Sequence, residues 1–591
     1  MSLFGDGFTL AATEAVLGPD ALHAVDALAE QSMLSVRETA HGLRYRMLET
    51  VREFGRMKLK EAGEEEPARR AQLAWAAAYS LGHATRLFGP EEFAAADALR
   101  AEEGNLADLL RQALAEPDPA TTVRLLAGLG AMWSVRGDHE RILVHGDAIS
   151  EALSGWTPPP GLVEVTRAAT LVTLSNIMVV AEHRGYGLLD LLRRLPAGAE
   201  TDPRMAALTV VTLAGEGLGT PAILERLAEL STSDDEHVAF AAMRQRAHLL
   251  ENAGDVAGAV EAAEQTVALL KQDDGQWLGA IMHAMQAHLL LQLGDRRRAV
   301  EHARIALPVL HRIGASDDEA QLRAVLVSAA IADGDLERAE AELAVIERIN
   351  DNEPVMGGVA TLALCSAEIA LARGETDSAL AAFRLGVQRA RELRVPGMAD
   401  MEAAPWTVVA ESIALTAHAY HARGDAVRYG ERLFADIARH DLLSPHNPHL
   451  DYPMCGSMLF GLGAWGLLRG AMPAERAIRL LVLAERFSYN ILLPSMAIER
   501  IEPHAERAAP GLLAAVRAEY GDRRGAGLLG EAQRFVEQAG ELTGGSQVPF
   551  VAADRQRRED RDDGQAGDDR PGHLAGDGGV VGQVAGRRDQ V

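Results

Sequence analysis

The sequence predicts an all-α fold built from repeated helical hairpins. Alanine and leucine dominate, and aromatic residues make up only 4%, a composition that favours helices over strands. A Gly-Asp or Gly-Glu dipeptide recurs at a constant interval in the middle of the chain, which is typical of a stacked repeat. The chain of 591 residues is also longer than one hydrophobic core usually serves. We therefore expect a repeat array together with smaller domains.

The repeated turn is the most regular feature of the sequence. Its glycines are Gly254, Gly294, Gly334 and Gly374, and a fifth copy, Gly424, follows after a longer interval. An alanine stands five residues after each of the first four glycines. A glycine in this position supplies the left-handed cap that ends a helix. The alanine then allows the second helix to pack closely on the first.

Small or apolar residues also recur at fixed distances from the turn. Seven residues before the glycines stand Ala247, Ala287, Val327, Ala367 and Ala417. These offsets resemble the tetratricopeptide motif, whose repeat is about 34 residues, although longer helices or loops are needed for the spacing seen here. We predict a right-handed superhelix of tetratricopeptide-like hairpins over residues 162–540, with a concave groove. A helical bundle with fortuitous turns is the alternative.

Two further parts of this array lack the full signature. The segment Val163–Leu230 has the length of two more units without the Gly-Asp turn. Gly470 with Ala477 has the features of a degraded unit near the end of the array. We therefore expect helical pairs before and after the regular repeats.

Residues 1–65 predict a different layout. Two short helices and an alternating strand pair precede an amphipathic helix: Thr9–Leu17, Ala21–Gln31, Met33–Arg37, Leu43–Met47 and Leu48–Ala62. In the second strand, Leu43, Tyr45 and Met47 share one face, as in a half-buried hairpin. Helix, helix, hairpin, helix is a winged-helix order, so we predict a winged-helix-like domain at residues 1–65.

The second strand of this hairpin and the helix that follows it carry a resemblance to a known family. The run Arg44–Phe54 resembles the winged-helix segment that follows the nucleotide-binding domain in bacterial STAND-type regulators of the SARP and large LuxR types. Glu103–Leu106 resembles a helix of the same regulators, although Ala107 and Asp108 depart from its pattern. The resemblance implies an ATPase module before residue 1 and a role in transcriptional regulation.

The nucleotide-binding loop of that module does not occur in this sequence. The chain contains no G-x-x-x-x-G-K-[ST] motif, and without it there is no backbone cradle for phosphates. We therefore expect the carboxy-terminal half of such a regulator, made separately or truncated, with no cofactor and no ATP hydrolysis.

Six basic residues form a candidate surface in the winged-helix segment: Arg44, Arg46, Arg52, Arg56, Lys58 and Lys60. Three hypotheses remain open for it. The cations pair at i,i+4 with the interleaved glutamates on a solvated face, they dock a nucleotide-binding module, or they contact DNA. The helix Ala21–Gln31 holds the recognition position, but it carries Asp26 and Glu30 and no Lys or Arg, which opposes binding to phosphates.

The remaining segments are a linker domain and a tail. Residues 66–155 predict a helical linker domain that contains a hairpin, with Ala127–Arg136 as its first helix and a turn at Gly137-Asp138. The proline-rich stretch Trp156–Gly161 marks the end of this domain. Residues 545–591 lack the apolar side chains needed for a core. We predict that they are disordered, or that they are translated from a wrong reading frame.

Composition also limits the compartment and the partners. The formal net charge is −27, which opposes general binding to nucleic acid or anionic lipid. The two cysteines, Cys365 and Cys455, cannot staple a chain of this size, so we expect a reducing, cytoplasmic environment. The cations are nearly all arginine, which indicates a high-GC, actinobacterial type of gene. No membrane partner is expected.

One cluster of metal-ligating residue types stands between two predicted helices: His440, Asp441, His446, His449, Asp451 and Cys455. Zinc accepts such ligands, but the segment also contains three prolines and has no fixed helical face. His418 and His421 lie three residues apart on a helix, without an evident third ligand. We predict no catalytic, metal or cofactor residues, and an enzyme or metal protein centred on this loop is the weakest hypothesis.

These features together predict a non-enzymatic regulatory scaffold in transcriptional regulation. The repeat groove would bind a protein or inducer, and the winged helix would dock a nucleotide-binding ATPase module. The alternative is a transcription factor that binds DNA directly through the winged helix.

Overall fold

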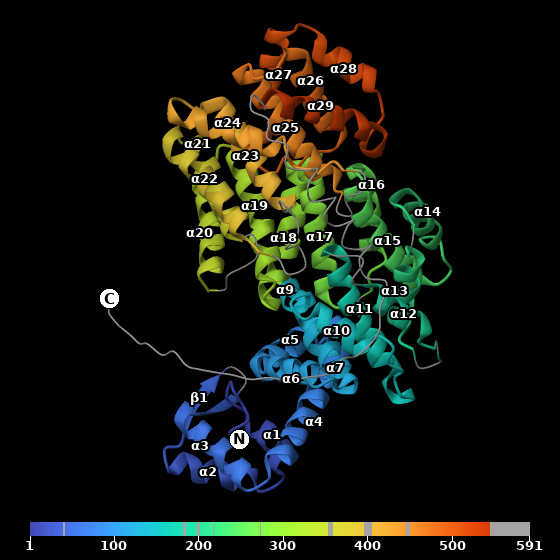
Figure 1. Cartoon of the computed structure of the whole chain (residues 1–591), viewed down its shortest axis with the longest axis vertical. Coiled ribbons are helices and arrows are strands. Elements are labelled where there is room, and N and C mark those ends of the chain that lie inside the picture. The colour runs from blue at the N-terminus through green and yellow to red at the C-terminus, as the bar shows by residue number, and fades with distance from the viewer. Residues whose placement is uncertain are drawn as a thin grey trace, which may run out of the picture. The chain divides into compact units, whose positions relative to one another are not determined.

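Helices make up most of the described structure, and a two-stranded antiparallel sheet lies near the amino terminus (Figure 1). The all-α prediction is therefore confirmed at this level. The computed structural model describes residues 1–39, 42–180, 185–196, 198, 201–216, 218–271, 274–352, 358–394, 405–444 and 450–543. The predicted tail lies outside these residues. None of the helices within these ranges combines the length and the apolar composition that spanning a bilayer requires.

The amino-terminal segment has the predicted order of elements: α1 (Leu10–Leu17), α2 (Ala21–Glu30), β1 (Leu34–Thr39), β2 (Gly42–Met47) and α3 (Glu49–Glu61). Thr9 caps α1 by accepting a hydrogen bond from the backbone of Ala12. Phe8 pairs with Tyr45 as an isolated bridge beside the hairpin. Its side chain is fully buried, so the hairpin is held over a small aromatic core.

A run of helices, most of them short, follows this segment: α4 (Glu65–Ala84), α5 (Glu92–Ala101), α6 (Glu103–Ala115), α7 (Pro119–Leu125), α8 (Ala131–Val135), α9 (His139–Leu143) and α10 (Gly146–Leu153). A π-helical turn, η2 (Leu126–Gly130), joins α7 to α8. Gly128 lies here against Ser80 of α4, and a Cβ at this position would clash with the Ser80 carbonyl oxygen. The regular helix predicted from Ala127 therefore begins with an irregular turn, at the point where the two backbones approach closely.

Helical pairs then succeed one another along the chain (Figure 1). They are α11 (Val163–Val180) with α12 (Tyr186–Arg194), α13 (Pro203–Ala214) with α14 (Thr220–Leu230), α15 (Glu236–Asn252) with α16 (Val256–Ala268), α17 (Gln276–Gln292) with α18 (Arg296–Ile313), α19 (Ser316–Ala332) with α20 (Leu336–Asn352), α21 (Gly358–Ala372) with α22 (Thr376–Glu392), α23 (Pro405–His421) with α24 (Asp425–Ile437), and α25 (Tyr452–Arg469) with α26 (Ala474–Arg486). Each pair packs against the next. The described part ends with α27 (Ile498–Ala508), α28 (Leu512–Tyr520) and α29 (Leu529–Thr543).

The first four Gly-acid turns share one geometry. Their glycines have φ between 76° at Gly334 and 80° at Gly374, the left-handed region that glycine adopts without strain. The residue after each glycine donates its backbone N–H to the carbonyl oxygen five residues before it. The N–O distance is 2.8 Å for the bond from Asp255 and 2.9 Å for the bond from Asp295. This is the Schellman arrangement that ends a helix. The alanines five residues after the glycines are fully buried: Ala259, Ala299, Ala339 and Ala379.

The fifth copy differs from the other four. Gly424 has φ 54° and ψ −126°, and it stands at the start of α24 without the bond across the turn seen in the others. No alanine follows it at the fifth position, where Tyr429 stands. Gly430 instead lies against Trp465, so that a Cβ there would overlap the indole ring. The interpretation of Gly424 as an equivalent turn is therefore wrong in its local geometry.

Two polar side chains of α5 contact the ends of helices in the repeat array. Glu92 accepts a hydrogen bond of 2.7 Å from the backbone N–H of Gln276, the first residue of α17. Arg100 donates to the carbonyl oxygen of Ile313, the last residue of α18, at 2.6 Å. A carboxylate at a helix amino terminus and a guanidinium at a carboxy terminus both complement the helix dipole. The linker helices are therefore fixed to the array by specific polar contacts.

The start and the end of the regular repeats also meet. Ser488, which follows α26, donates a hydrogen bond of 2.7 Å to the carbonyl oxygen of Gly254 in the first Gly-Asp turn. Gly525 lies close to the carbonyl oxygen of Ala253, and α15 packs against α25. The first regular hairpin is therefore in contact with elements that come much later in the chain.

Candidate functional site

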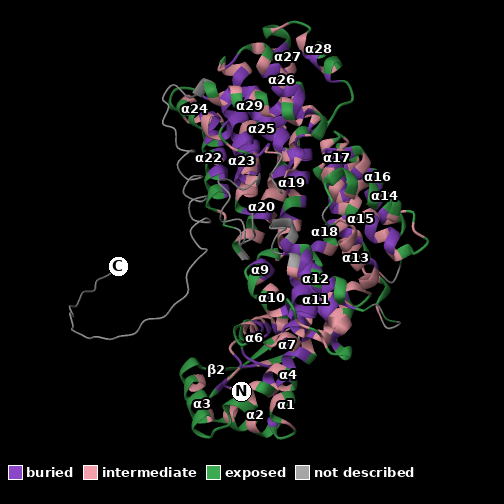
Figure 2. Ribbon diagram, turned by 45° about the vertical axis from the view of Figure 1, so that its right-hand side comes forward, coloured by how far each residue is buried: buried purple, intermediate pink, exposed green. Residues whose placement is uncertain are grey.

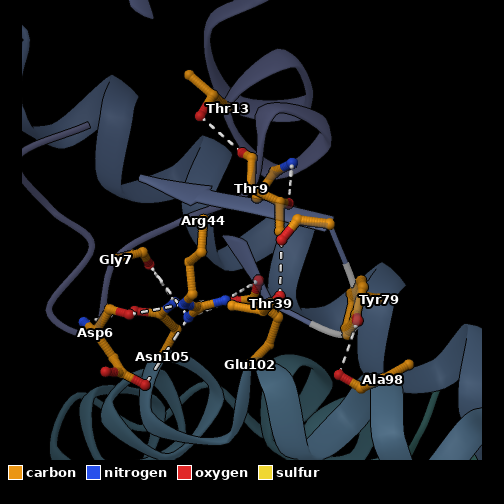
Figure 3. A network of polar contacts seen from close by, with 12 residues as sticks. Asp6, Gly7, Thr9, Thr13, Thr39, Arg44, Tyr79, Ala98, Glu102 and Asn105 are labelled. Atoms are coloured by element: carbon orange, nitrogen blue, oxygen red, sulfur yellow. Dashed lines mark hydrogen bonds and ion pairs between the residues drawn. The ribbon is translucent and has the colours of Figure 1, made fainter. Parts of the chain in front are cut away.

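Arg44 of β2 lies in a network that ties the hairpin to the start of α6 (Figure 3). Its guanidinium donates to both carboxylate oxygens of Glu102, at 2.9 and 3.3 Å, and its Nε donates to the carbonyl oxygen of Asp6 at 3.0 Å. Glu102 is only 2% exposed. A two-pronged pair of this kind fixes orientation as well as charge. The guanidinium of Arg44 therefore makes its polar contacts within the chain.

Asn105 completes the same network. Its side-chain amide donates to Glu102 at 2.7 Å and to the carbonyl oxygen of Gly7 at 2.9 Å. Its own oxygen accepts a bond from the backbone N–H of Asp6 at 3.3 Å. The buried carboxylate of Glu102 is therefore bonded from two sides, as a buried charge requires. No sequence motif connects Asn105 with the hairpin, and its place in a family-like helix was the only signal.

The other predicted basic residues lie mostly on the surface of α3. Arg52 pairs with Glu49, and Lys58 pairs with Glu61 at 2.6 Å. These pairs are three residues apart, so the expected i,i+4 spacing is wrong for them. Arg56 donates to the carbonyl oxygen of Ser2 at 3.2 Å.

Arg46 and Lys60 complete the predicted basic surface. Both side chains are exposed, and they form no ion pair with any residue that the structure describes.

Apolar side chains are exposed on the same segment. Phe54 and Met57 of α3 are 56% and 47% exposed, and Val36 and Leu43 of the hairpin are 50% and 52% exposed. None of the residues of α3 is fully buried, and Figure 2 shows α3 largely in the colour of exposed residues. Large apolar side chains gathered on one small segment mark a candidate protein-binding surface. We call Val36, Leu43, Phe54 and Met57 the apolar face.

The described members of the predicted histidine and cysteine cluster each make separate structural contacts. His440 lies 3.0 Å from a carboxylate oxygen of Glu411, which also pairs with Arg391 at 2.6 Å. Asp451 caps α25 by accepting from the backbone of Met454 at 2.8 Å, and Cys455 is buried in the core. His446 and His449 lie outside the described residues, and those that are described include no group of three ligands suited to a metal.

His418 and Cys365 are both core residues. His418 is fully buried, and its Nδ1 lies 2.7 Å from the carbonyl oxygen of Ala414. Burial lowers the pKa of His418 to about 4. Cys365 lies in the core of the later hairpins, and burial raises the pKa of its thiol to about 12. A thiol with this pKa stays protonated at neutral pH and is a poor nucleophile.

Two carboxyl groups lie near each other where α15 packs against α25. Burial and the nearby charge of Asp451 raise the pKa of Glu251 to about 7. Burial raises the pKa of Asp451 to about 6. No local pattern in the sequence pairs these residues, because they belong to separate hairpins that are distant along the chain. We therefore expect the contact between early and late hairpins to depend on pH.

A surface hollow of 570 Å³ lies between α12 and the residues that follow α10. Its lining includes Arg193 and Asp190, which form an ion pair at 2.5 Å, and Arg193 also pairs with Glu216. The charge of Arg193 is thus already neutralised by these two carboxylates.

No protein-family model matches the chain, and no curated protein matches it. The resemblance to STAND-type regulators therefore stays a prediction that rests on the residues quoted for it.

Proposed function

We propose that the chain is a non-enzymatic regulatory scaffold that acts in transcriptional regulation by binding other proteins. Its amino-terminal segment would be a winged-helix domain that docks a nucleotide-binding module. The observation that carries this proposal is the apolar face, which leaves Phe54 and Met57 in solvent. Burying such side chains against a partner removes apolar surface from water, which is the main favourable term in protein association.

The contacts of the basic residues favour protein docking over direct DNA binding. Arg44 is held by Glu102, and Arg52 and Lys58 are paired with neighbouring glutamates. Specific DNA binding needs several cations free to neutralise phosphates. The helix in the recognition position, α2, also carries Asp26 and Glu30, which repel the backbone of DNA.

The helical pairs supply the second binding surface of the proposal. We infer that they form a tetratricopeptide-like superhelix whose concave groove binds a protein or an inducer. Support comes from the shared geometry of the turns at Gly254, Gly294, Gly334 and Gly374 and from the packing of each pair on the next. Repeats of this kind create extended binding surfaces because each unit contacts mainly its neighbours.

Hydrogen–deuterium exchange tests the docking part of this proposal. The full chain is mixed with the P-loop nucleotide-binding module of a STAND-type regulator from the same genome, and exchange is compared with and without the module. We expect slower exchange in α3 and β2, which carry most of the apolar face. Unchanged exchange in both elements at saturating module would contradict docking through this face.

The alternative, direct DNA binding, has its own test. Arg46→Glu and Lys60→Glu reverse two exposed cations of the segment that form no ion pair among the described residues. If the chain binds DNA through them, duplex binding measured by fluorescence anisotropy weakens in the double variant and depends steeply on salt. We expect no such salt-dependent binding by the unmodified chain.

A further inference from the structure

Three neighbouring side chains near the end of α23 and in α27 each carry a buried polar atom without a hydrogen-bond partner. These atoms are Oη of Tyr420, Nε2 of His421 and Nδ1 of His504. Buried polar side-chain atoms nearly always have a partner, so each exception needs an explanation. Three such atoms on neighbouring side chains point to a partner that this chain does not supply.

The side chains that carry these atoms lie close together. The ring centroid of Tyr420 is 6.0 Å from that of His421 and 6.1 Å from that of His504. The guanidinium of Arg500 lies over the Tyr420 ring, with Cζ 4.8 Å from the centroid. Residues from α23 and α27, in separate parts of the sequence, thus form one cluster of two imidazoles, a phenol and a guanidinium.

Arg500 gives this cluster a positive charge. Arg500 is an exposed residue, and among the described carboxylates Glu368 interacts with it through space. Glu368 is itself buried, accepts a hydrogen bond of 3.1 Å from the backbone of Ser495, and has its pKa raised to about 7 by burial. It therefore offsets only part of the Arg500 charge at neutral pH.

The ring groups complement this charge with hydrogen-bond donors. Burial raises the pKa of Tyr420 to about 12, so its hydroxyl keeps its proton. Burial, together with Arg500 and Arg469, lowers the pKa of His421, so its imidazole is neutral near pH 7. A phenol and a neutral imidazole can each donate one hydrogen bond to an oxygen atom.

We propose that Tyr420, His421, Arg500 and His504 form a binding site for the oxyanion group of a small molecule, either a carboxylate or a phosphate. A guanidinium beside neutral donors is the arrangement that binds oxyanions well. The positive charges of Arg500 and Arg469 oppose a metal cation at the same place. The inference rests on the proposed function and deepens it, because such a molecule would be the inducer of the array.

Isothermal titration calorimetry of the full chain with two probes tests this site. Phenyl phosphate represents the phosphate class and benzoate the carboxylate class, and both carry a ring that can pack on Tyr420. We expect saturable binding of at least one probe, and the comparison between them decides the class. Absence of saturable binding for both would overturn the proposal.

Variants locate the binding. Arg500→Gln and Tyr420→Phe are each expected to weaken the affinity for the probe by about tenfold or more, since each removes a direct contact worth about 1.4 kcal/mol. Arg534→Gln is the matched control, because Arg534 is exposed on α29 and its loss changes the net charge equally. Equal binding by Arg500→Gln and Arg534→Gln would place the probe elsewhere and refute the site.

Two outcomes separate this site from the wider proposal. Loss of probe binding in Arg500→Gln with normal docking of the nucleotide-binding module would support both. Normal docking with no probe binding in the unmodified chain would refute the oxyanion site and leave the scaffold function standing.

Discussion

The hydroxyl of Ser488 donates a hydrogen bond of 2.7 Å to the carbonyl oxygen of Gly254, and this bond links residues 234 positions apart. Ser488 has φ 53°, in the left-handed region that disfavours side chains. The first Gly-Asp turn thus packs on the segment after α26. The contact constrains the repeats at both ends.

Substitutions of Ser488 separate the bond from the backbone strain. Ser488→Ala loses the hydrogen bond and keeps the unfavourable φ, so we expect a loss of about 1 kcal/mol in unfolding free energy. Ser488→Gly loses the bond but relieves about 1 kcal/mol of strain, so it should be close to neutral. Chemical denaturation of both variants measures the difference; equal destabilisation would show that the strain is absent.

The turn glycines are expected to differ in their tolerance of alanine. Gly254→Ala and Gly294→Ala each force a side chain into the left-handed region, at a cost of about 1–2 kcal/mol. A Cβ at Gly254 would lie 3.4 Å from Phe487 and Tyr452, whereas one at Gly294 would meet nothing within 4 Å. Because these neighbours limit how the first turn can relax, Gly254→Ala should lower the thermal unfolding midpoint more than Gly294→Ala. The reverse order would contradict the contact between the first turn and the segment after α26.

Removing Arg44 should loosen the amino-terminal segment. Arg44→Gln leaves the carboxylate of Glu102 buried with only Asn105 as a strong donor, and breaking a buried pair costs about 3–5 kcal/mol. The double variant Arg44→Met with Glu102→Leu removes both charges and should recover most of this loss. Thermal unfolding of the single and double variants measures these changes in stability. Arg46→Gln, at an exposed site, is the control and should change stability by less than about 0.5 kcal/mol.

The carboxyl groups of Glu251 and Asp451 predict a pH dependence of stability. Their folded pKa values, about 7 and about 6, lie above the ordinary carboxyl values. Between about pH 4.5 and 7 the folded state therefore binds more protons than the unfolded state, and this contribution to stability is lost as pH rises. Glu251→Gln cannot ionise, so its stability relative to the unmodified chain should increase by about 1–3 kcal/mol from pH 5 to pH 8.

Urea unfolding of the two proteins across this pH range gives the comparison. The difference between their unfolding free energies isolates Glu251 from other titrating groups, such as His418, whose lowered pKa acts in the opposite direction. A difference that does not change between pH 5 and pH 8 would contradict the burial of the Glu251 carboxyl group.

The local parts of the fold could be predicted from the sequence, and the long-range contacts could not. The turns at Gly254 and Gly294 have a local signal, because the turn glycine determines how a helix ends. Gly424 shares the dipeptide but lacks the alanine, and there the local signal misled. The pairing of Ser488 with Gly254, and of Arg44 with Glu102, depends on how distant helices pack.

The candidate sites show the same limit. The basic residues near Arg44 were visible in the sequence, but their partners were not, so the choice between solvated, docking and DNA-binding roles stayed open. The cluster around Tyr420 and Arg500 has no motif, since it is formed by two helices whose positions follow from packing. Among its members, His421 alone has a local feature, its spacing from His418.

Calorimetric titration of the full chain with the P-loop nucleotide-binding module measures whether the chain docks that module. We predict saturable binding that is weakened by about tenfold or more in Phe54→Gln, since burying this side chain is worth about 1.5–3 kcal/mol. Glu53→Gln, at the neighbouring exposed position, should bind as the unmodified chain does. Equal affinity of the Phe54 and Glu53 variants, or no binding of the module at all, would contradict docking of the module through the apolar face.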